Sequence, residues 1–151
     1  MKRFTDVNEA IDSLKRSEKM LNSLPMYDLE RIGRVFLWHL YNICEAALYV
    51  CCAHDASNSG TITFPSLKEL PKFNKIPSMD IPRDVRTAAK KACEYSKPDL
   101  ENDINPIEFY DAIQTMKAIL KWICENTRVL EIKHILESVL ELDVLNRIFA
   151  L

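Results

Sequence analysis

The sequence predicts an all-α fold, and three features of the chain support this prediction. Its 151 residues contain only two glycines, whereas average usage is about 7% and turn-rich β-folds need glycine at many turns. Several segments repeat apolar residues near the helical period of 3.6, and helix-capping residues precede some of them. The length corresponds to one domain. We therefore expect a single up-and-down bundle of four main helices with an additional C-terminal helix.

The first predicted helix begins after Asp6 and ends before Pro25. Glu9 follows Asp6 at the spacing of a capping box. The second helix spans about residues 28–54, and its stretch 35–53 is long enough to cross a membrane. That stretch contains His39, Asn42 and Glu45, and a charge at the centre of a membrane helix costs about 2.5–3.5 kcal/mol. We therefore expect a buried helix of a soluble bundle and no membrane partner.

A polar and aromatic stripe runs along this second helix. Its members lie close to one line at 100° per residue, and they are Arg31, Arg34, Trp38, Asn42, Glu45 and Tyr49. Polar groups need water, a ligand or another chain to satisfy them. We expect the stripe to line a cleft or to cross a dimer axis, with Glu45 paired to an arginine of either subunit.

The segment 55–82 is predicted to be irregular and to pack on the bundle as a tethered loop, with one helical turn at 66–70. It holds Pro65, Pro71, Pro77 and Pro82, which exclude a long helix. The third helix is expected to begin with Pro82 at its first position. The fourth follows Asn105, with Pro106 next and Glu108 at the capping-box position.

The remaining C-terminal segment, 127–151, is expected to form a helical extension of the 6–125 core. Asn126 and Thr127 suggest a break before it, and residues 129–149 are apolar on more than one side. A helix of this kind needs two neighbours or a partner chain to cover it. Together with the stripe, it leads us to expect a homodimer.

Charge is unevenly distributed along a chain whose net charge is −2. Residues 65–100 contain 8 basic and 5 acidic residues, a balance of +3, while residues 101–151 contain 5 and 9, a balance of −4. Three cations of the third helix share a face, and Lys97 follows them. A basic row can bind a phosphate backbone or can be a solvated surface; it consists of Arg83, Arg86, Lys90 and Lys97.

Five cysteines lie among apolar neighbours, at positions 44, 51, 52, 93 and 124. We interpret them as reduced core thiols of a cytoplasmic protein. The segment Cys51-Cys52-Ala53-His54 has soft ligands, but no second ligand pair follows, so we predict no metal site and no cofactor.

Two arginine–histidine pairs have the residue types of a metal-free ribonuclease, with an arginine to hold phosphate and a histidine as acid or base. They are Arg34 with His39 and Arg128 with His134. The alternative explanation is chance, since a helical chain with this much arginine and three histidines contains such pairs without function.

Four segments resemble the HEPN family, whose name stands for higher eukaryotes and prokaryotes nucleotide-binding. Residues 36–48 (FLWHLYNICEAAL) are similar to the long second helix, and residues 64–70 to a His-Ser-Leu segment. Tyr95-Ser96-Lys97-Pro98-Asp99 stands where many members have Arg-Tyr-Pro-Asp. Residues 109–112 and 119–123 resemble the final core helix. The resemblance implies a bundle of four to five helices that binds nucleotide or RNA, or that partners a nucleotidyltransferase or an antitoxin.

The chain departs from the family at two places. Ser96-Lys97 replaces Arg-Tyr, so a phosphate role there passes to Lys97. Nuclease members carry an Arg–His motif near the start of the last core helix, whereas residues 95–105 contain neither arginine nor histidine. We therefore expect a non-catalytic binding module. The alternatives are a toxin-like ribonuclease using an Arg/His pair at a dimer interface, and a purely structural interaction module.

Overall fold

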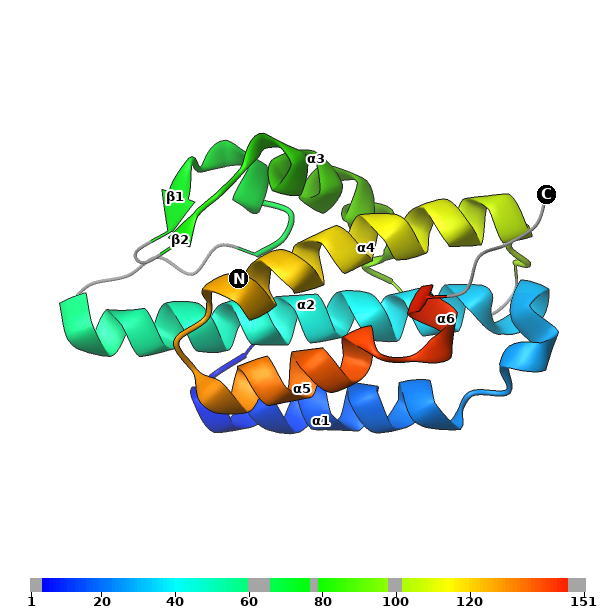
Figure 1. Cartoon of the computed structure of the whole chain (residues 1–151), viewed down its shortest axis with the longest axis horizontal. Coiled ribbons are helices and arrows are strands. Elements are labelled where there is room, and N and C mark those ends of the chain that lie inside the picture. Colours follow the sequence, from blue (N-terminus) through cyan, green and yellow to red (C-terminus); the bar gives the residue numbers. More distant parts are fainter. Residues whose placement is uncertain (1–3, 60–65, 77–78, 98–101, 147–151) are drawn as a thin grey trace.

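A computed structural model describes residues 4–59, 66–76, 79–97 and 102–146. The chain is predominantly helical, as Figure 1 shows, and this confirms the all-α class. The elements follow in the order α1 (Val7–Ser23), η1 (Met26–Asp28), α2 (Leu29–Ser59), η2 (Leu70–Lys72), β1 (Lys75–Ile76), β2 (Met79–Asp80), α3 (Arg83–Ala92), η3 (Cys93–Tyr95), α4 (Pro106–Asn126), α5 (Leu130–Leu140) and α6 (Asp143–Asn146).

Helix α2 is the centre of the molecule. Figure 1 shows α1 and α5 on one side of it and α3 on the other, with α4 crossing beside it. Every residue of α2 from 39 to 48 is buried, which explains why this stretch is apolar enough to resemble a membrane span. By length and composition the helical stretch Leu29–His54 passes a test for membrane spans, and 83% of its most apolar window is buried inside the structure.

Capping side chains define the starts of α1 and α4. The side chain of Asp6 accepts from the backbone N–H of Glu9 at 2.8 Å, and the carboxylate of Glu9 accepts in return from Thr5. Asn105 accepts from the N–H of Glu108 at 2.8 Å, with Pro106 at the first turn. Both predicted starts are confirmed. The prediction for α3 is one position too early. Pro82 is the N-cap of this helix rather than its first helical residue, because its backbone is extended.

The segment between α2 and α3 differs in detail from the prediction. Helix α2 continues to Ser59, beyond the expected end at residue 54. The expected helical turn at 66–70 is present, because the N–H of Leu70 donates to the carbonyl of Ser66 at 2.9 Å, and η2 follows it directly. Lys75 pairs with Asp80 in an antiparallel pair of two-residue strands, which the sequence did not predict. Trp122 of α4 donates from Nε1 to the carbonyl of Asp80 at 2.9 Å, so this loop is tethered to the helices as expected.

The C-terminal segment, as far as residue 146, contains two helices rather than one, because a turn at 141–142 separates α5 from α6. The predicted break before it is confirmed, with Thr127 as C-cap of α4. Lys15 of α1 pairs with Glu131 of α5 at 2.9 Å. Lys117 of α4 donates to the carbonyl of Leu145 and to Asn146 Oδ1, both at 3.0 Å.

The apolar side chains of α5 and α6 are therefore covered by the same chain. Buried positions are Ile132, Leu136, Val139, Val144 and Leu145, whereas Leu130 is 65% exposed. Up to residue 146, the segment packs on α4 and is joined to α1 by the Lys15–Glu131 pair, so the apolar surface of this part is not by itself a reason for a partner chain. The predicted apolar positions beyond residue 146 lie outside the described residues.

Gly33 provides a direct test of how closely α2 approaches the segment before α4. A Cβ at this position would overlap Cγ2 of Ile104 and lie 3.1 Å from Cδ2 of Phe109. Overpacking of this kind costs about 1–3 kcal/mol, against a helix-propensity gain of about 1 kcal/mol for Ala over Gly. We expect Gly33→Ala to lower the free energy of unfolding in urea, and Ile104→Ala in the same chain to remove the clash. Additive losses in the double variant would contradict this packing.

Candidate functional site

The polar stripe of α2 does not face one neighbour. Asn42 donates from Nδ2 to Ser17 Oγ at 2.7 Å and to Ser13 Oγ at 3.0 Å, both on α1. Arg34 instead lies 3.5 Å from Glu108 of α4. At the near end, Arg31 is exposed and 3.8 Å from Asp28. At the far end Tyr49 stacks obliquely on Phe4, with ring centroids 5.5 Å apart.

Glu45 has neutral partners in place of the predicted arginine. Its side chain is buried, with 9% exposure. Oε1 accepts from the hydroxyl of Tyr41 at 2.8 Å, and Oε2 accepts from the backbone N–H of Leu67 at 3.2 Å. Within the described part of the chain Glu45 therefore forms no arginine pair, because two hydrogen-bond donors already satisfy its buried carboxylate. A pair with an arginine of a second subunit stays a prediction. Burial and this carboxylate both raise the pKa of Tyr41.

The pair Arg34 and His39 is not assembled within the chain. His39 is buried against α1, with Nδ1 3.4 Å from Ser17 Oγ, while Arg34 is held by Glu108 of α4. Five positions along a helix separate two side chains by about 140°. Arg128 and His134, the second pair, are both exposed; Arg128 lies in the connection before α5 and His134 on α5.

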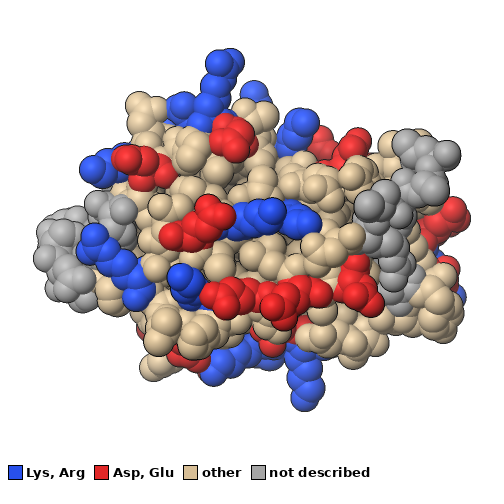
Figure 2. All heavy atoms as spheres, in the orientation of Figure 1, with Lys and Arg blue, Asp and Glu red and all other residues tan. Residues whose placement is uncertain are grey.

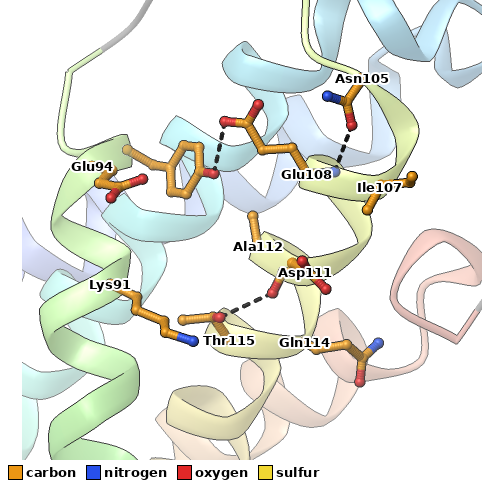
Figure 3. A pocket seen from close by; sticks show the side chains of 10 residues that line it. Lys91, Glu94, Asn105, Ile107, Glu108, Asp111, Ala112, Gln114 and Thr115 are labelled. Atoms are coloured by element: carbon orange, nitrogen blue, oxygen red, sulfur yellow. Dashed lines mark hydrogen bonds between the residues drawn. The ribbon is translucent and has the colours of Figure 1, made fainter.

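A cleft of about 700 Å³ separates the end of α3 from the start of α4 (Figure 3). Lys91 and Glu94 reach it from the α3 side, and Glu108, Asp111 and Thr115 line it from α4. This is the neighbourhood, at the start of the last core helix, where the resemblance leads us to look for an Arg–His motif. Arg34 reaches Glu108 there from α2, which the linear sequence did not indicate.

The electrostatics of this cleft do not favour phosphate. Tyr95 donates to Glu108 Oε1 at 3.4 Å, and burial, then the Glu108 carboxylate, raises the pKa of Tyr95 to about 12. The phenol therefore stays protonated at neutral pH. Glu94 and Asp111 add two carboxylates to a wall in which Lys91 is the cation. Such a surface accepts hydrogen bonds from amines or amides and repels anions.

The predicted basic row is only partly a free surface. Arg83, Lys90 and Lys97 are exposed, and no ion pair within the described residues engages them. Arg86 is different, because its guanidinium donates to Asn74 Oδ1 at 2.6 Å and its Nε is buried. Arg86 thus holds the loop before β1 onto α3. Figure 2 shows Lys and Arg projecting along the edge where α3 lies, whereas a row of acidic side chains crosses the face over α5.

The cysteines have the character of core residues. Cys44, Cys51, Cys52 and Cys124 are buried and Cys93 is partly exposed. Burial is the main cause that raises the thiol pKa of Cys44, Cys93 and Cys124, which opposes thiolate formation. In the part of the chain that the structure describes, no three His, Cys, Asp or Glu side chains come together as a metal site.

The sequence did not indicate two groups of residues that the structure brings together. Ser13 and Ser17 face α2 from an otherwise apolar side of α1, and their spacing of four was the available signal. Among the cleft residues, Glu108 and Asp111 lie three positions apart on α4, whereas Tyr95 comes from η3, so no local pattern joins Tyr95 to them.

No family model matches the chain, and no curated protein or solved structure shows a significant match. Its function has to be inferred from the side chains and their surroundings.

Buried His39 predicts a pH dependence of stability. Burial lowers its pKa in the folded chain, so the unfolded chain, in which histidine has a pKa of about 6.5, binds more protons at mildly acidic pH. The free energy of unfolding should therefore fall as pH drops below about 6.5. We expect urea unfolding at about pH 7.5 and pH 5.5 to show this loss in the wild type and a smaller loss in His39→Gln.

The matched control is His134→Gln, because His134 is exposed on α5. It should keep the pH dependence of the wild type. An unchanged pH dependence in His39→Gln would contradict the assignment.

Proposed function

We propose that this chain is a non-catalytic, HEPN-like four-helix binding module that contacts the phosphates of RNA or of a nucleotide through the exposed cations of α3. One observation carries the proposal: Arg83 and Lys90 are exposed on the same helix, and no ion pair of the described residues occupies them or Lys97. Cations without a protein partner are available to a phosphate backbone.

Neighbouring elements extend this basic surface. Lys72 of η2 and Lys75 of β1 are exposed beside α3, which packs on η2. Asp80, Asp84 and Glu94 are exposed in the same stretch and reduce the positive potential. The expected binding is therefore weak and strongly dependent on salt.

The non-catalytic part of the proposal rests on the position of the candidate pair. A ribonuclease of the alternative kind needs an arginine and a histidine at one phosphate. Arg34 and His39 contact different helices, α4 and α1. At the start of α4, Glu108 lies 3.5 Å from Arg34 and accepts a hydrogen bond from Tyr95. Among the described contacts there, Arg34 provides a cation, but no histidine provides an imidazole.

Assembly and cellular context remain predictions. A homodimer, a nucleotidyltransferase or antitoxin partner and a cytoplasmic location fit a binding module of this kind. A purely structural module without any phosphate ligand is the outcome if the following experiment finds no binding.

Charge reversal on α3 tests the proposal. We expect Arg83→Glu with Lys90→Glu to abolish binding of a fluorescently labelled single-stranded RNA, measured by anisotropy at about 0.05 M salt. Arg86 is left unchanged, because its bond to Asn74 is structural. The matched control is Lys121→Glu with Lys133→Glu, an equal change in charge at exposed positions of α4 and α5.

The control should retain RNA binding, and both variants should melt within a few degrees of the wild type. Equal weakening by the two variants would show that only net charge matters and would overturn the assignment to α3. Full binding by the α3 variant would do the same.

A further inference from the structure

A second concave site lies at the seam between α1 and α2. We call it the seam pocket, and its volume is about 350 Å³. This volume is at the small end of the range of about 300–1,000 Å³ for sites of small ligands. Figure 1 shows α1 and α3 on opposite sides of α2, so this pocket is separate from the basic surface. Its lining has three parts, which are a polar floor, an apolar wall and two opposite charges at the rim.

The floor consists of buried polar side chains that a network of hydrogen bonds holds in place. Ser17 and Asn42 are each 4% exposed, and His39 is 9% exposed. The amide of Asn42 donates to Ser13 Oγ at 3.0 Å and to Ser17 Oγ at 2.7 Å. Ser17 Oγ in turn lies 3.4 Å from His39 Nδ1. A connected polar group of this kind holds its members in fixed positions.

Two hydrogen-bond donors of the floor remain available to a ligand. Burial lowers the pKa of His39, so the ring is neutral at neutral pH and carries one proton. We assign Nδ1 as the acceptor from Ser17, which places that proton on Nε2. Nε2 has no hydrogen-bond partner among the described residues, although His39 is buried and lines the pocket. Ser13 accepts from Asn42 and still has its own hydroxyl proton. The floor therefore favours a ligand that carries a carbonyl oxygen.

Apolar side chains form the wall beside this floor. Trp38 is half-buried and meets the His39 ring edge-on, with ring centroids 4.6 Å apart. Phe4 and Met20 also line the pocket, and Met20 is 42% exposed. Methionine adapts its shape to the groups that it contacts. The wall therefore fits an apolar side chain of a ligand, which would lose water-exposed surface there.

Glu9 and Arg16 place opposite charges at the rim of the pocket, where both are exposed. Hydrogen bonds from Thr5, and to a smaller extent the charge of Arg16, lower the pKa of Glu9, so its carboxylate is charged at neutral pH. Both bonds from Thr5 go to Oε2, which leaves Oε1 as an acceptor. Within the described part of the chain Arg16 forms no ion pair. The two charges are therefore close enough to influence each other but do not pair.

This arrangement of charges disfavours ligands of large net charge. Glu9 repels an anion that Arg16 attracts, and Arg16 repels a cation that Glu9 attracts, whereas a zwitterion is attracted at both ends. The two residues are seven positions apart, so their Cα atoms are about 10.5 Å apart along α1. A free α-amino acid carries both charges on one carbon atom. A dipeptide extends over about 7 Å, and two long side chains can reach its ends.

We propose that the seam pocket binds a dipeptide with both ends free. Its ammonium group lies at Glu9 and its carboxylate at Arg16. Its peptide carbonyl accepts from Ser13 and His39, and an apolar side chain lies against Trp38. Each part of the lining thus meets a complementary group of one small molecule. The site uses no residue of α3, so it does not depend on the proposed function.

Capped peptides test the two ends separately. The probes are glycyl-leucine and leucyl-glycine, their N-acetyl and C-amide derivatives, and free leucine, each titrated into the full chain by calorimetry. We expect at least one dipeptide to bind at millimolar concentration and to bind more tightly than leucine. N-acetylation removes the charge that faces Glu9, and amidation removes the charge that faces Arg16. Each change should lower the affinity about fivefold, the upper range for an exposed ion pair.

Two neutralising variants identify which residue faces which end. In Glu9→Gln, N-acetylation should no longer lower the affinity, whereas amidation should still lower it about fivefold. Arg16→Gln should show the reverse. Glutamine at position 9 is compatible with the capping box, so the start of α1 is retained. The matched controls are Asp12→Asn and Lys19→Gln, which neutralise exposed charges of α1 outside the pocket lining; both should behave as the wild type does.

A third variant tests the floor. Ser13→Leu, at a half-buried position, should fill the pocket and abolish binding of every peptide, with folding checked by its melting temperature. If this variant does not fold, the two glutamine variants still decide the question.

Four results would overturn the proposal. The first is that neither dipeptide binds at millimolar concentration, and the second is that leucine binds as tightly as the dipeptides. The third is that capping lowers the affinity equally in the wild type and in both glutamine variants, which would place the peptide elsewhere. The fourth is a loss on N-acetylation without a loss on amidation, which would indicate the N-terminus of a longer chain as the ligand.

Discussion

The structure depends on satisfying polar side chains on a helix that is buried along most of its length. Asn42, Glu45 and His39 are each nine-tenths or more buried, and a buried polar group without a partner costs about 1–3 kcal/mol. Asn42 and His39 have partners in the serines of α1. Glu45 has one partner in the backbone of Leu67, in the loop after α2, and another in Tyr41, one turn earlier on α2 itself. Because these partners are specific, they determine where α1 and the loop after α2 can lie.

The same requirement determines which surface remains available to a ligand. Arg34 is engaged with Glu108, and Arg86 with Asn74, so both contribute to holding elements together. The exposed cations Arg83 and Lys90 of α3 form no ion pair with another described element. The acidic residues of α5, Glu131 and Glu137, are exposed, and Figure 2 shows a row of acidic side chains over that part of the molecule. Under the proposed function, this uneven distribution of charge directs a phosphate ligand to α3 rather than to α5, in a chain whose net charge is −2.

The sequence predicts well those features that depend on residues close together in the chain. The starts of α1 and α4 depend on residues three positions apart, so Asp6 and Asn105 identify them without any knowledge of the fold. The break at Thr127, the C-cap of α4, likewise depends on neighbouring residues. Residues 35–53 have the composition of a membrane span, and most of this stretch is buried inside the chain, where Glu45 and Asn42 have hydrogen-bond partners.

Features that depend on distant segments were not predictable. The stripe on α2 looked like one surface, but residues within about 40° of a line still separate when α1 and the 66–70 loop pack on either side of it. The donors for Glu45 are a hydroxyl and a backbone amide, and sequence reasoning that searched for an arginine could not identify a backbone group. Arg34 and Glu108 are joined only by the crossing of α2 and α4.

The central claim is that the buried polar groups of α2 find their partners within the same chain, and the Glu45 tether tests it most directly. Hydrogen exchange at the amide of Leu67, followed by NMR, reports whether that N–H is bonded to the carboxylate. The account predicts strong protection in the wild type and at least a tenfold faster exchange in Glu45→Ala, with the amides in the middle of α4 still protected. Exchange of the wild-type Leu67 amide at the rate of an exposed loop would contradict it.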